Sequence, residues 1–166
     1  MCGKTTIGQA IAEKLSWDFL DTDQAVEKKY FSHTDQNHSC REIYRHHGET
    51  AFRDLEKQQI YSLKTYTKHV ISLGGGSLMD HENAKLIQDL RIVIYLKASF
   101  ETLCSRMQTV GIPAYLDVND PEKSLRILVD QRTPIYEAVS QKTFEIKNFS
   151  PNEIADLIME KVIHGQ

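Results

Sequence analysis

The sequence has few cysteines, no basic excess and no long apolar run, and each shortage argues against a class of function. Its three cysteines, Cys2, Cys40 and Cys104, are odd in number and widely spaced, without a C-x-x-C metal pair. This pattern is typical of reduced thiols, so we expect a cytoplasmic protein. The net charge of -3, without a run of Lys or Arg, argues against binding to nucleic acid. No apolar run approaches membrane-spanning length and no signal-peptide core is present, so we expect no membrane association.

The residues that are present predict one globular α/β domain over 1–166. With 40% hydrophobic and 26% charged residues the chain can bury a proper core, and it shows no repeat or linker. The apolar pattern predicts strands at 17–20, 70–73, 92–96 and 142–146. It predicts helices at 24–30, 42–44, 49–63, 100–107, 121–139 and 151–163. Strands separated by helices imply a parallel sheet within a three-layer sandwich.

Irregular segments interrupt this pattern at three places. Residues 32–39 are polar and turn-forming, which predicts a surface loop, and Gly48 predicts a break between two helical stretches. Residues 108–120 have no clear period and contain Gly111 and Pro113. A loop of this length in a compact domain is typical of a moving lid.

The first motif with chemical meaning is Gly3-Lys4-Thr5, which has the form of the closing half of a phosphate-binding loop. It precedes apolar residues at helical spacing, namely Ile7, Ala10, Ile11 and Leu15. The N–H groups and dipole of a helix start favour an anion, Lys4 adds a positive charge, and the Thr5 hydroxyl would hold magnesium. The alternative is an ordinary helix start capped by Thr5 or Thr6.

Two further motifs follow predicted strands. Asp21 and Asp23 come after the strand at 17–20, and Gly74-Gly75-Gly76 comes after the strand at 70–73. Ligands of an open parallel sheet bind beyond the carboxyl ends of its strands, so we expect both motifs to share one crevice with the phosphate loop. One carboxylate can approach a metal ion and the other a substrate hydroxyl, but an Asp before a helix is also a common cap. The glycines either let the backbone approach a ligand or form a flexible turn.

Arg53 and Arg132 gain meaning only from the motifs that contain them, because lone arginines are usually surface groups. The chain carries five motifs in order: Gly-Lys-Thr-Thr-Ile-Gly, Phe-Leu-Asp-Thr-Asp, Gly-Glu-x-x-Phe-Arg-x-x-Glu, Ser-Leu-Gly-Gly-Gly and Arg-x-Pro-Ile-Tyr. Together they resemble shikimate kinase over nearly the whole chain. The resemblance implies a P-loop, nucleoside-monophosphate-kinase-like fold with a five-stranded parallel sheet. It also implies transfer of the ATP γ-phosphate to the 3-hydroxyl of shikimate, in the pathway to chorismate and the aromatic amino acids.

The same resemblance implies roles at the nucleotide. Lys4 would stabilise the β- and γ-phosphates, and Thr5 would bind Mg²⁺ with support from Asp21. The other residues that would bind ATP are Gly3, Thr6 and Arg106, the last by stacking on adenine.

At the acceptor, Asp23 would accept a hydrogen bond from the attacking hydroxyl and act as its base or orienter. Arg53 and Arg132 would clamp the shikimate carboxylate, a planar anion that fits a guanidinium fork. The residues that would line the shikimate pocket are Gly74, Gly75 and Gly76. The partners implied are shikimate and ATP, and a monomer is expected.

Two departures from the family pattern affect these expectations. Only Met1 and Cys2 precede Gly3, so the first glycine of the loop and the first strand are missing. In the family that strand is central, and its loss would leave a gap between 70–73 and 92–96. We expect Met1 to be an internal methionine, at the third of four variable loop positions, left by a misassigned start codon or by trimming.

The second departure lies in the expected lid. Shikimate kinases commonly carry Arg-Pro-Leu-Leu there, whereas this chain has Ile112-Pro113-Ala114-Tyr115. Ile112 cannot supply a charge to the transferring phosphate, and we do not expect Arg106 to substitute fully. Loss of such an arginine can lower turnover by orders of magnitude.

Two other functions stay open from the sequence. One is a different small-molecule kinase of the same fold, of the gluconate kinase type, although paired arginines with three glycines favour a cyclic polyol that bears a carboxylate. The other is a truncated or degenerate, non-catalytic binding protein, which half a phosphate loop and no lid arginine would suit.

Overall fold

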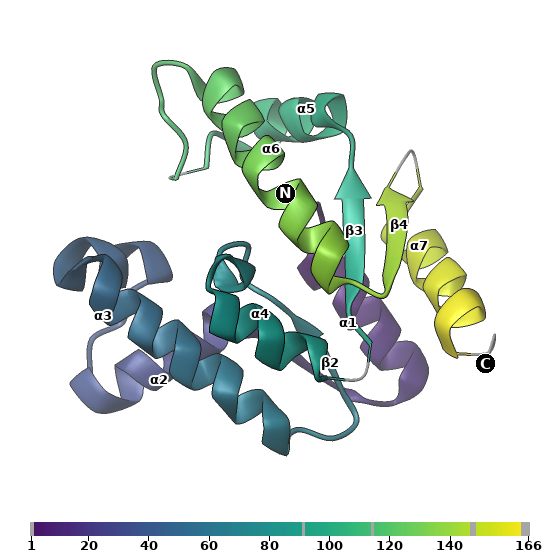
Figure 1. Ribbon diagram of the computed structural model, residues 1–166, viewed down its shortest axis with the longest axis horizontal. Helices are drawn as coiled ribbons and strands as arrows, with labels where there is room; N and C mark the ends of the chain where they lie inside the picture. The colour runs from purple at the N-terminus through teal and green to yellow at the C-terminus, as the bar shows by residue number, and fades with distance from the viewer. Residues whose placement is uncertain (1, 91, 114, 147–148, 164–166) are drawn as a thin grey trace. The chain divides into compact units, whose positions relative to one another are not determined.

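The computed structural model describes residues 2–90, 92–113, 115–146 and 149–163, over which helices and strands alternate (Figure 1). The elements in chain order are α1 Lys4–Leu15, β1 Asp18–Asp21, α2 Thr22–Thr34, α3 Cys40–Ser62, β2 His69–Ser72, α4 His81–Gln88, β3 Ile94–Ala98, α5 Phe100–Val110, α6 Pro121–Val139, β4 Lys142–Ile146 and α7 Pro151–Ile158. Short 3₁₀ helices occupy Leu63–Thr65 and Ser77–Met79, and a π-helical stretch, Met159–Ile163, follows α7. None of the helices described is long and apolar enough to cross a membrane.

The chain divides into two compact units, which we describe separately. Residues 8–90 form the N-terminal unit, and residues 1–7 with 91–166 form the C-terminal unit. The expectation of a single domain over 1–166 stays a prediction.

A parallel strand pair positions the candidate residues of the N-terminal unit. β1 lies beside β2 with Asp18 opposite His69 and Asp21 opposite Ser72. Both strands therefore end at the same edge, where α2 and the glycine loop begin. Next to the sheet, α2 and α3 pack through four buried side chains, Val26, Tyr30, Ile43 and Phe52.

Local capping explains where α2 and α3 start. Asp21 is the N-cap of α2, because its Oδ1 accepts hydrogen bonds from the N–H groups of Asp23 and Gln24. A reciprocal capping box between Ser39 and Glu42 starts α3. The predicted break at Gly48 is confirmed, because its φ of 79° and ψ of 175° interrupt the helix.

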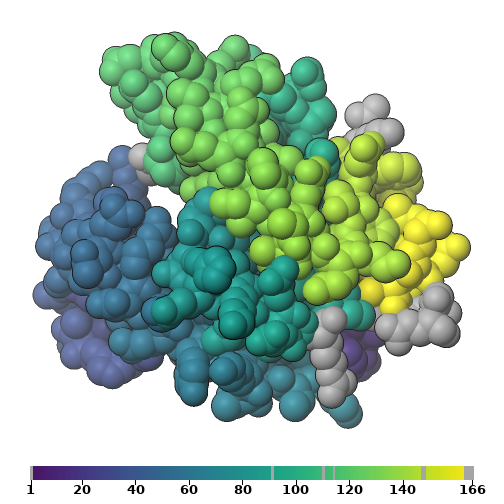
Figure 2. Space-filling view, viewed as in Figure 1, coloured from purple at the N-terminus to yellow at the C-terminus, as the bar shows by residue number. Residues whose placement is uncertain are grey.

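The C-terminal unit contains the second parallel pair. β3 lies beside β4 with Ile94 opposite Lys142 and Ala98 opposite Ile146. α5 and α6 share an apolar cluster built on Met107, Leu116 and Leu125. Much of α6 and of the chain before it can be seen on the molecular surface in Figure 2, coloured light green.

The structure confirms four strands near the predicted positions and shifts several boundaries. β3 starts at Ile94 rather than at 92, and α2 continues to Thr34, so the predicted loop at 32–39 begins later. α5 likewise extends to Val110 into the predicted lid, of which Ala114 lies outside the described residues. α4 was not predicted at all. The described strands form two separate two-stranded sheets, β1 with β2 and β3 with β4.

Candidate active site

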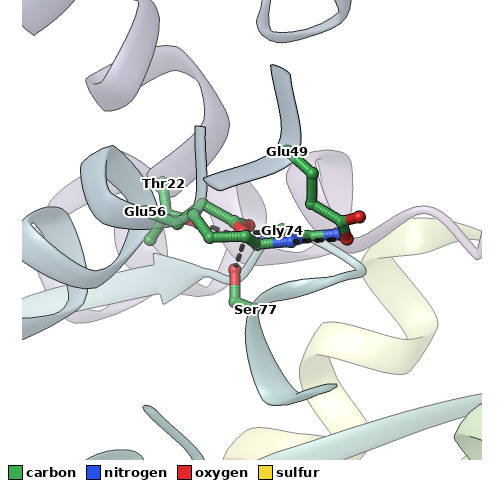
Figure 3. Close-up of polar contacts among 6 residues, drawn as sticks. Thr22, Glu49, Glu56, Gly74 and Ser77 are labelled. Atoms are coloured by element: carbon green, nitrogen blue, oxygen red, sulfur yellow. Dashed lines mark hydrogen bonds and ion pairs between the residues drawn. The ribbon is translucent and has the colours of Figure 1, made fainter. Parts of the chain in front are cut away.

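At the carboxyl edge of β1 and β2, the glycine loop is tied to the start of α2. The N–H of Gly74 donates to Thr22 Oγ1 over 2.8 Å, and Thr22 is buried (Figure 3). A Cβ added to Gly74 would lie less than 3.0 Å from Asp23 Oδ1 and 3.0 Å from Ser77 Oγ. A side chain at position 74 would therefore displace the Asp23 carboxylate, which lies directly against the loop.

Arg53 reaches the other end of the same loop from α3. A Cβ on Gly76 would lie 3.0 Å from Nη1 of Arg53, so the guanidinium covers this glycine. The guanidinium forms an ion pair with Glu56, one turn further along α3, and its Nε lies 3.8 Å from Oε1 of Glu49. The N-terminal unit thus brings together Asp23, the glycine loop and Arg53.

A buried carboxylate holds Arg53 in this position. Glu56 is only 5% exposed, and its second oxygen, Oε1, accepts a hydrogen bond of 3.1 Å from Ser77 Oγ, also buried (Figure 3). A buried charge must be paired and hydrogen-bonded, and Glu56 meets both conditions. The chain Ser77–Glu56–Arg53 therefore fixes a cation beside the glycine loop before any ligand is present.

Glu56 and Ser77 were not singled out from the sequence. Glu56 is the last residue of Gly-Glu-x-x-Phe-Arg-x-x-Glu, and its spacing of three from Arg53 puts both side chains on one helix face. That spacing was an available signal for Glu56. Ser77 comes from a segment 21 residues away, and no local pattern indicates its contact with Glu56.

Cys40 lies close to the acid motif. Its Sγ donates to the backbone oxygen of Asp23 over 3.3 Å. Burial raises the pKa of the Cys40 thiol far above its ordinary range, and the negative charges of Asp23 and Glu27 raise it further. The thiol therefore stays protonated. Cys2, Cys40 and Cys104 are all free cysteines in the described part of the chain.

In the C-terminal unit, Gly3 starts the phosphate-motif helix. Gly3 has a positive φ of 88°, and its carbonyl accepts the first helical hydrogen bond, from the N–H of Ile7 over 2.9 Å. Lys4 is the first residue of α1, so Thr5 and Thr6 lie inside its first turn. The alternative in which one of them is the N-cap is therefore wrong.

A cavity of about 320 Å³ adjoins this helix start. It is lined by Cys2, Gly3, Thr6, Ile7, Arg106, Ile146, Phe149, Pro151 and Ile154. Arg106 comes close to the loop, since a Cβ on Gly3 would lie 3.8 Å from its Nη1. Three predicted nucleotide residues, Gly3, Thr6 and Arg106, thus line one hollow with mainly apolar neighbours.

Arg132, on α6, belongs to the same unit as Lys4. Its guanidinium lies 6.0 Å from the centre of the Tyr115 ring. Burial raises the pKa of Tyr136, and the positive charges of Arg132 and Lys4 partly oppose this rise. Both cations therefore act on one phenol, which also packs on Tyr95 of β3 with ring centres 5.3 Å apart.

The candidate residues thus form one set in each unit. The prediction that the two sets face a single crevice stays a prediction, as do the individual roles of the residues. Asp21 acts as a helix cap, and this does not conflict with a place near a metal ion. No group of three or more His, Cys, Asp or Glu side chains within the described ranges could hold a metal ion alone.

Parallel α/β strand pairs, a Gly-Lys-Thr helix start and an acid beside a glycine loop define a P-loop kinase of small molecules. Solved structures agree. A shikimate kinase from Acinetobacter baumannii in complex with shikimate superposes with a TM-score of 0.89 at 28% identity, covering 99% of this chain and 89% of that chain. A shikimate kinase from Aquifex aeolicus, at 23% identity and TM-score 0.76, shares the fold over 99% of this chain and 92% of its own. The predicted P-loop, nucleoside-monophosphate-kinase-like fold class is confirmed.

Sequence relatives identify the family. The family model for shikimate kinase matches residues 1–163. A shikimate kinase of Caldanaerobacter subterraneus subsp. tengcongensis is 32% identical over 97% of this chain and 90% of its own length. One from Thermodesulfovibrio yellowstonii is 30% identical over 96% and 88%. The chain belongs to the shikimate kinase family, and the family predicted from its five motifs is confirmed.

Proposed function

We propose that this protein transfers the γ-phosphate of ATP to the 3-hydroxyl of shikimate, in the biosynthesis of chorismate and the aromatic amino acids. The observation that carries the proposal is the fixed placement of Arg53 and Asp23 at the two ends of one glycine loop. Shikimate has a carboxylate at one end of its ring and hydroxyls at the other. A cation and an acid separated by backbone N–H groups suit that shape.

At the acceptor end, Arg53 and Arg132 clamp the carboxylate, and Gly74, Gly75 and Gly76 line the ring. Asp23 accepts a hydrogen bond from the 3-hydroxyl and orients it or removes its proton. Because Glu56 already holds Arg53, little side-chain ordering accompanies ligand binding. This end of the site supplies position rather than covalent chemistry.

At the nucleotide end, the first turn of α1 receives the phosphates, with Lys4 on the β- and γ-phosphates and Gly3 and Thr6 beside them. Arg106 stacks on the adenine, next to the cavity near Gly3.

The metal ion in this proposal is Mg²⁺. Mg²⁺ prefers oxygen ligands and is usually bound through one or two protein groups together with substrate phosphates, which the Thr5 hydroxyl and the Asp21 carboxylate fit. The cap hydrogen bonds to Asp21 Oδ1 hold that carboxylate in one place. When bound, the ion neutralises charge on the transferring phosphoryl group. We further propose that the protein is a monomer in the cytoplasm, where its three cysteines stay reduced.

The test is a coupled assay of ADP release by the purified chain with shikimate and MgATP. Phosphorus NMR then identifies the product. We expect a phosphate ester at the 3-hydroxyl, loss of turnover with EDTA, and loss of at least about 100-fold in Asp23→Asn. Gluconate in place of shikimate is the matched control and should give background rates. Turnover with gluconate but not with shikimate would show that the protein is a kinase of the gluconate type instead. Shikimate binding by calorimetry without any ADP release would favour a non-catalytic binding protein.

A further inference from the structure

Thr22 stands between the two aspartates of the acid motif, yet the catalytic roles proposed above do not use it. It is the first residue of α2 and is 2% exposed. Its hydroxyl oxygen accepts the N–H of Gly74, a residue 52 positions further along the chain. A buried polar side chain that reaches this particular backbone group needs a reason beyond filling space.

The hydrogen bond joins two parts whose relative position matters. On one side is the start of α2, where Asp23 is the next residue after Thr22. On the other side is the glycine loop, which lies so close to the Asp23 carboxylate that a Cβ at position 74 would displace it. A shift of the loop would therefore alter the distance between the Asp23 oxygens and the loop N–H groups.

Other contacts hold the loop on either side of this hydrogen bond. The parallel pairing of β1 with β2 ends at Asp21 and Ser72, one residue before Thr22 and two before Gly74. The Ser77–Glu56 hydrogen bond holds the far end of the loop. Between these two anchors, the hydrogen bond between Thr22 and Gly74 joins the loop to the helix that carries Asp23.

We propose that Thr22 is a positioning residue of the phosphoryl-transfer site: its hydroxyl holds Gly74 so that the Asp23 carboxylate faces the acceptor hydroxyl. The proposal rests on the function proposed above. It predicts an effect on the acceptor substrate that is separate from the nucleotide. A purely structural threonine would instead lower stability and change both substrates alike.

The experiment compares Thr22→Val, which keeps the side-chain shape but removes the acceptor, with Thr22→Ser, which keeps the hydroxyl. In Thr22→Val we expect kcat/KM for shikimate to fall at least about tenfold, while KM for ATP changes less than about twofold. Thr22→Ser should stay within about threefold of the wild type. Thr65→Val is the matched control, because it also removes a threonine hydrogen bond, to Ser62 O over 2.9 Å, but at an exposed place. Should Thr22→Val not fold, Thr22→Ala takes its place.

A second readout does not depend on activity. Hydrogen exchange at the Gly74 amide, followed by NMR, should accelerate at least about tenfold in Thr22→Val and stay slow in Thr22→Ser. Equal kinetics in the valine and serine variants, or an equal loss for shikimate and ATP, would overturn the proposal. If the wild-type chain does not phosphorylate shikimate, the proposed function is wrong, whatever the role of Thr22. In that case unchanged exchange at Gly74 in Thr22→Val would still overturn the positioning role.

Discussion

Replacing Gly74 with alanine tests the arrangement of the acid and the glycine loop most directly. Gly74 is not among the glycines with positive φ, so its backbone accepts an alanine. The added Cβ, however, would lie closer than 3.0 Å to Asp23 Oδ1, a distance that real Cβ atoms essentially never show. The Asp23 carboxylate must therefore rotate or the loop must move.

The expected magnitudes follow from that overlap. Inserting a methyl group where there is no room costs about 1–3 kcal/mol of unfolding free energy, or a fall in Tm of about 2–4 °C per kcal/mol for a chain of this size. A shift of about 1 Å in a catalytic group can cost about 100-fold in rate. We therefore expect Gly74→Ala to lose about 100-fold in kcat/KM for shikimate while it remains folded.

Gly48→Ala provides the matched control. A Cβ at Gly48 meets no atom within 4 Å, but its φ of +79° is strained for alanine. This variant should lose about 1–3 kcal/mol of unfolding free energy and keep its kcat/KM within about threefold. The assays are urea unfolding and steady-state kinetics on both variants. If activity falls in proportion to stability in both, or if Gly74→Ala stays fully active, the placement of Asp23 against the loop is refuted.

Three further predictions use other contacts. Glu56→Gln should raise the shikimate KM about tenfold in steady-state assays, because Arg53 loses its buried charge partner, whereas Glu49→Gln at an exposed site should change it less than about twofold; equal effects would contradict this reasoning. Hydrogen bonds from Ser150 lower the pKa of Glu153 from its ordinary 4.5, so its stabilising effect is present above that value and is lost as pH falls through the lower folded-state pKa. The Tm difference between wild type and Glu153→Gln should therefore be largest at neutral pH and shrink in acid, and a difference that grows in acid would be inconsistent with the cap. Because burial raises its pKa, the Cys40 thiol should react with iodoacetamide at pH 8 at least about 100-fold more slowly than free glutathione, as read by mass spectrometry; fast labelling would exclude a protonated, buried thiol.

Elements marked by local signals could be predicted from the sequence with near-correct ends. α6 starts at Pro121 and ends at Val139 as expected, because Asp120 caps it and Pro121 suits its first turn. β4 likewise matches at 142–146. The break at Gly48 was visible because glycine is rare inside a helix. These signals lie within a few residues of the feature that they predict.

Features that depend on distant residues could not be predicted. β3 begins at Ile94 because this residue pairs with Lys142, the first residue of β4. One residue earlier, the Val93 carbonyl accepts a hydrogen bond from the N–H of Gln141, which precedes β4. α4 has only eight residues and one fully buried aliphatic side chain, Ile87, too few for a clear period.

The site shows the same division. The five motifs named Asp23, Arg53 and the glycines, and the structure brings these together in one unit. The sequence did not indicate what holds them, since the Thr22–Gly74 and Ser77–Glu56 hydrogen bonds span 52 and 21 residues. The motif residues are recognisable by type, whereas the residues that hold them in place come from distant parts of the chain.

The burial of Glu56 also limits how this enzyme can change over generations. A mutation that removes the Arg53 guanidinium leaves the buried Glu56 carboxylate without its cationic partner. A mutation that removes the carboxylate leaves the guanidinium without the contact that fixes it. Either single change should be harmful, so we expect the residues at positions 53, 56 and 77 to change together during evolution rather than one at a time.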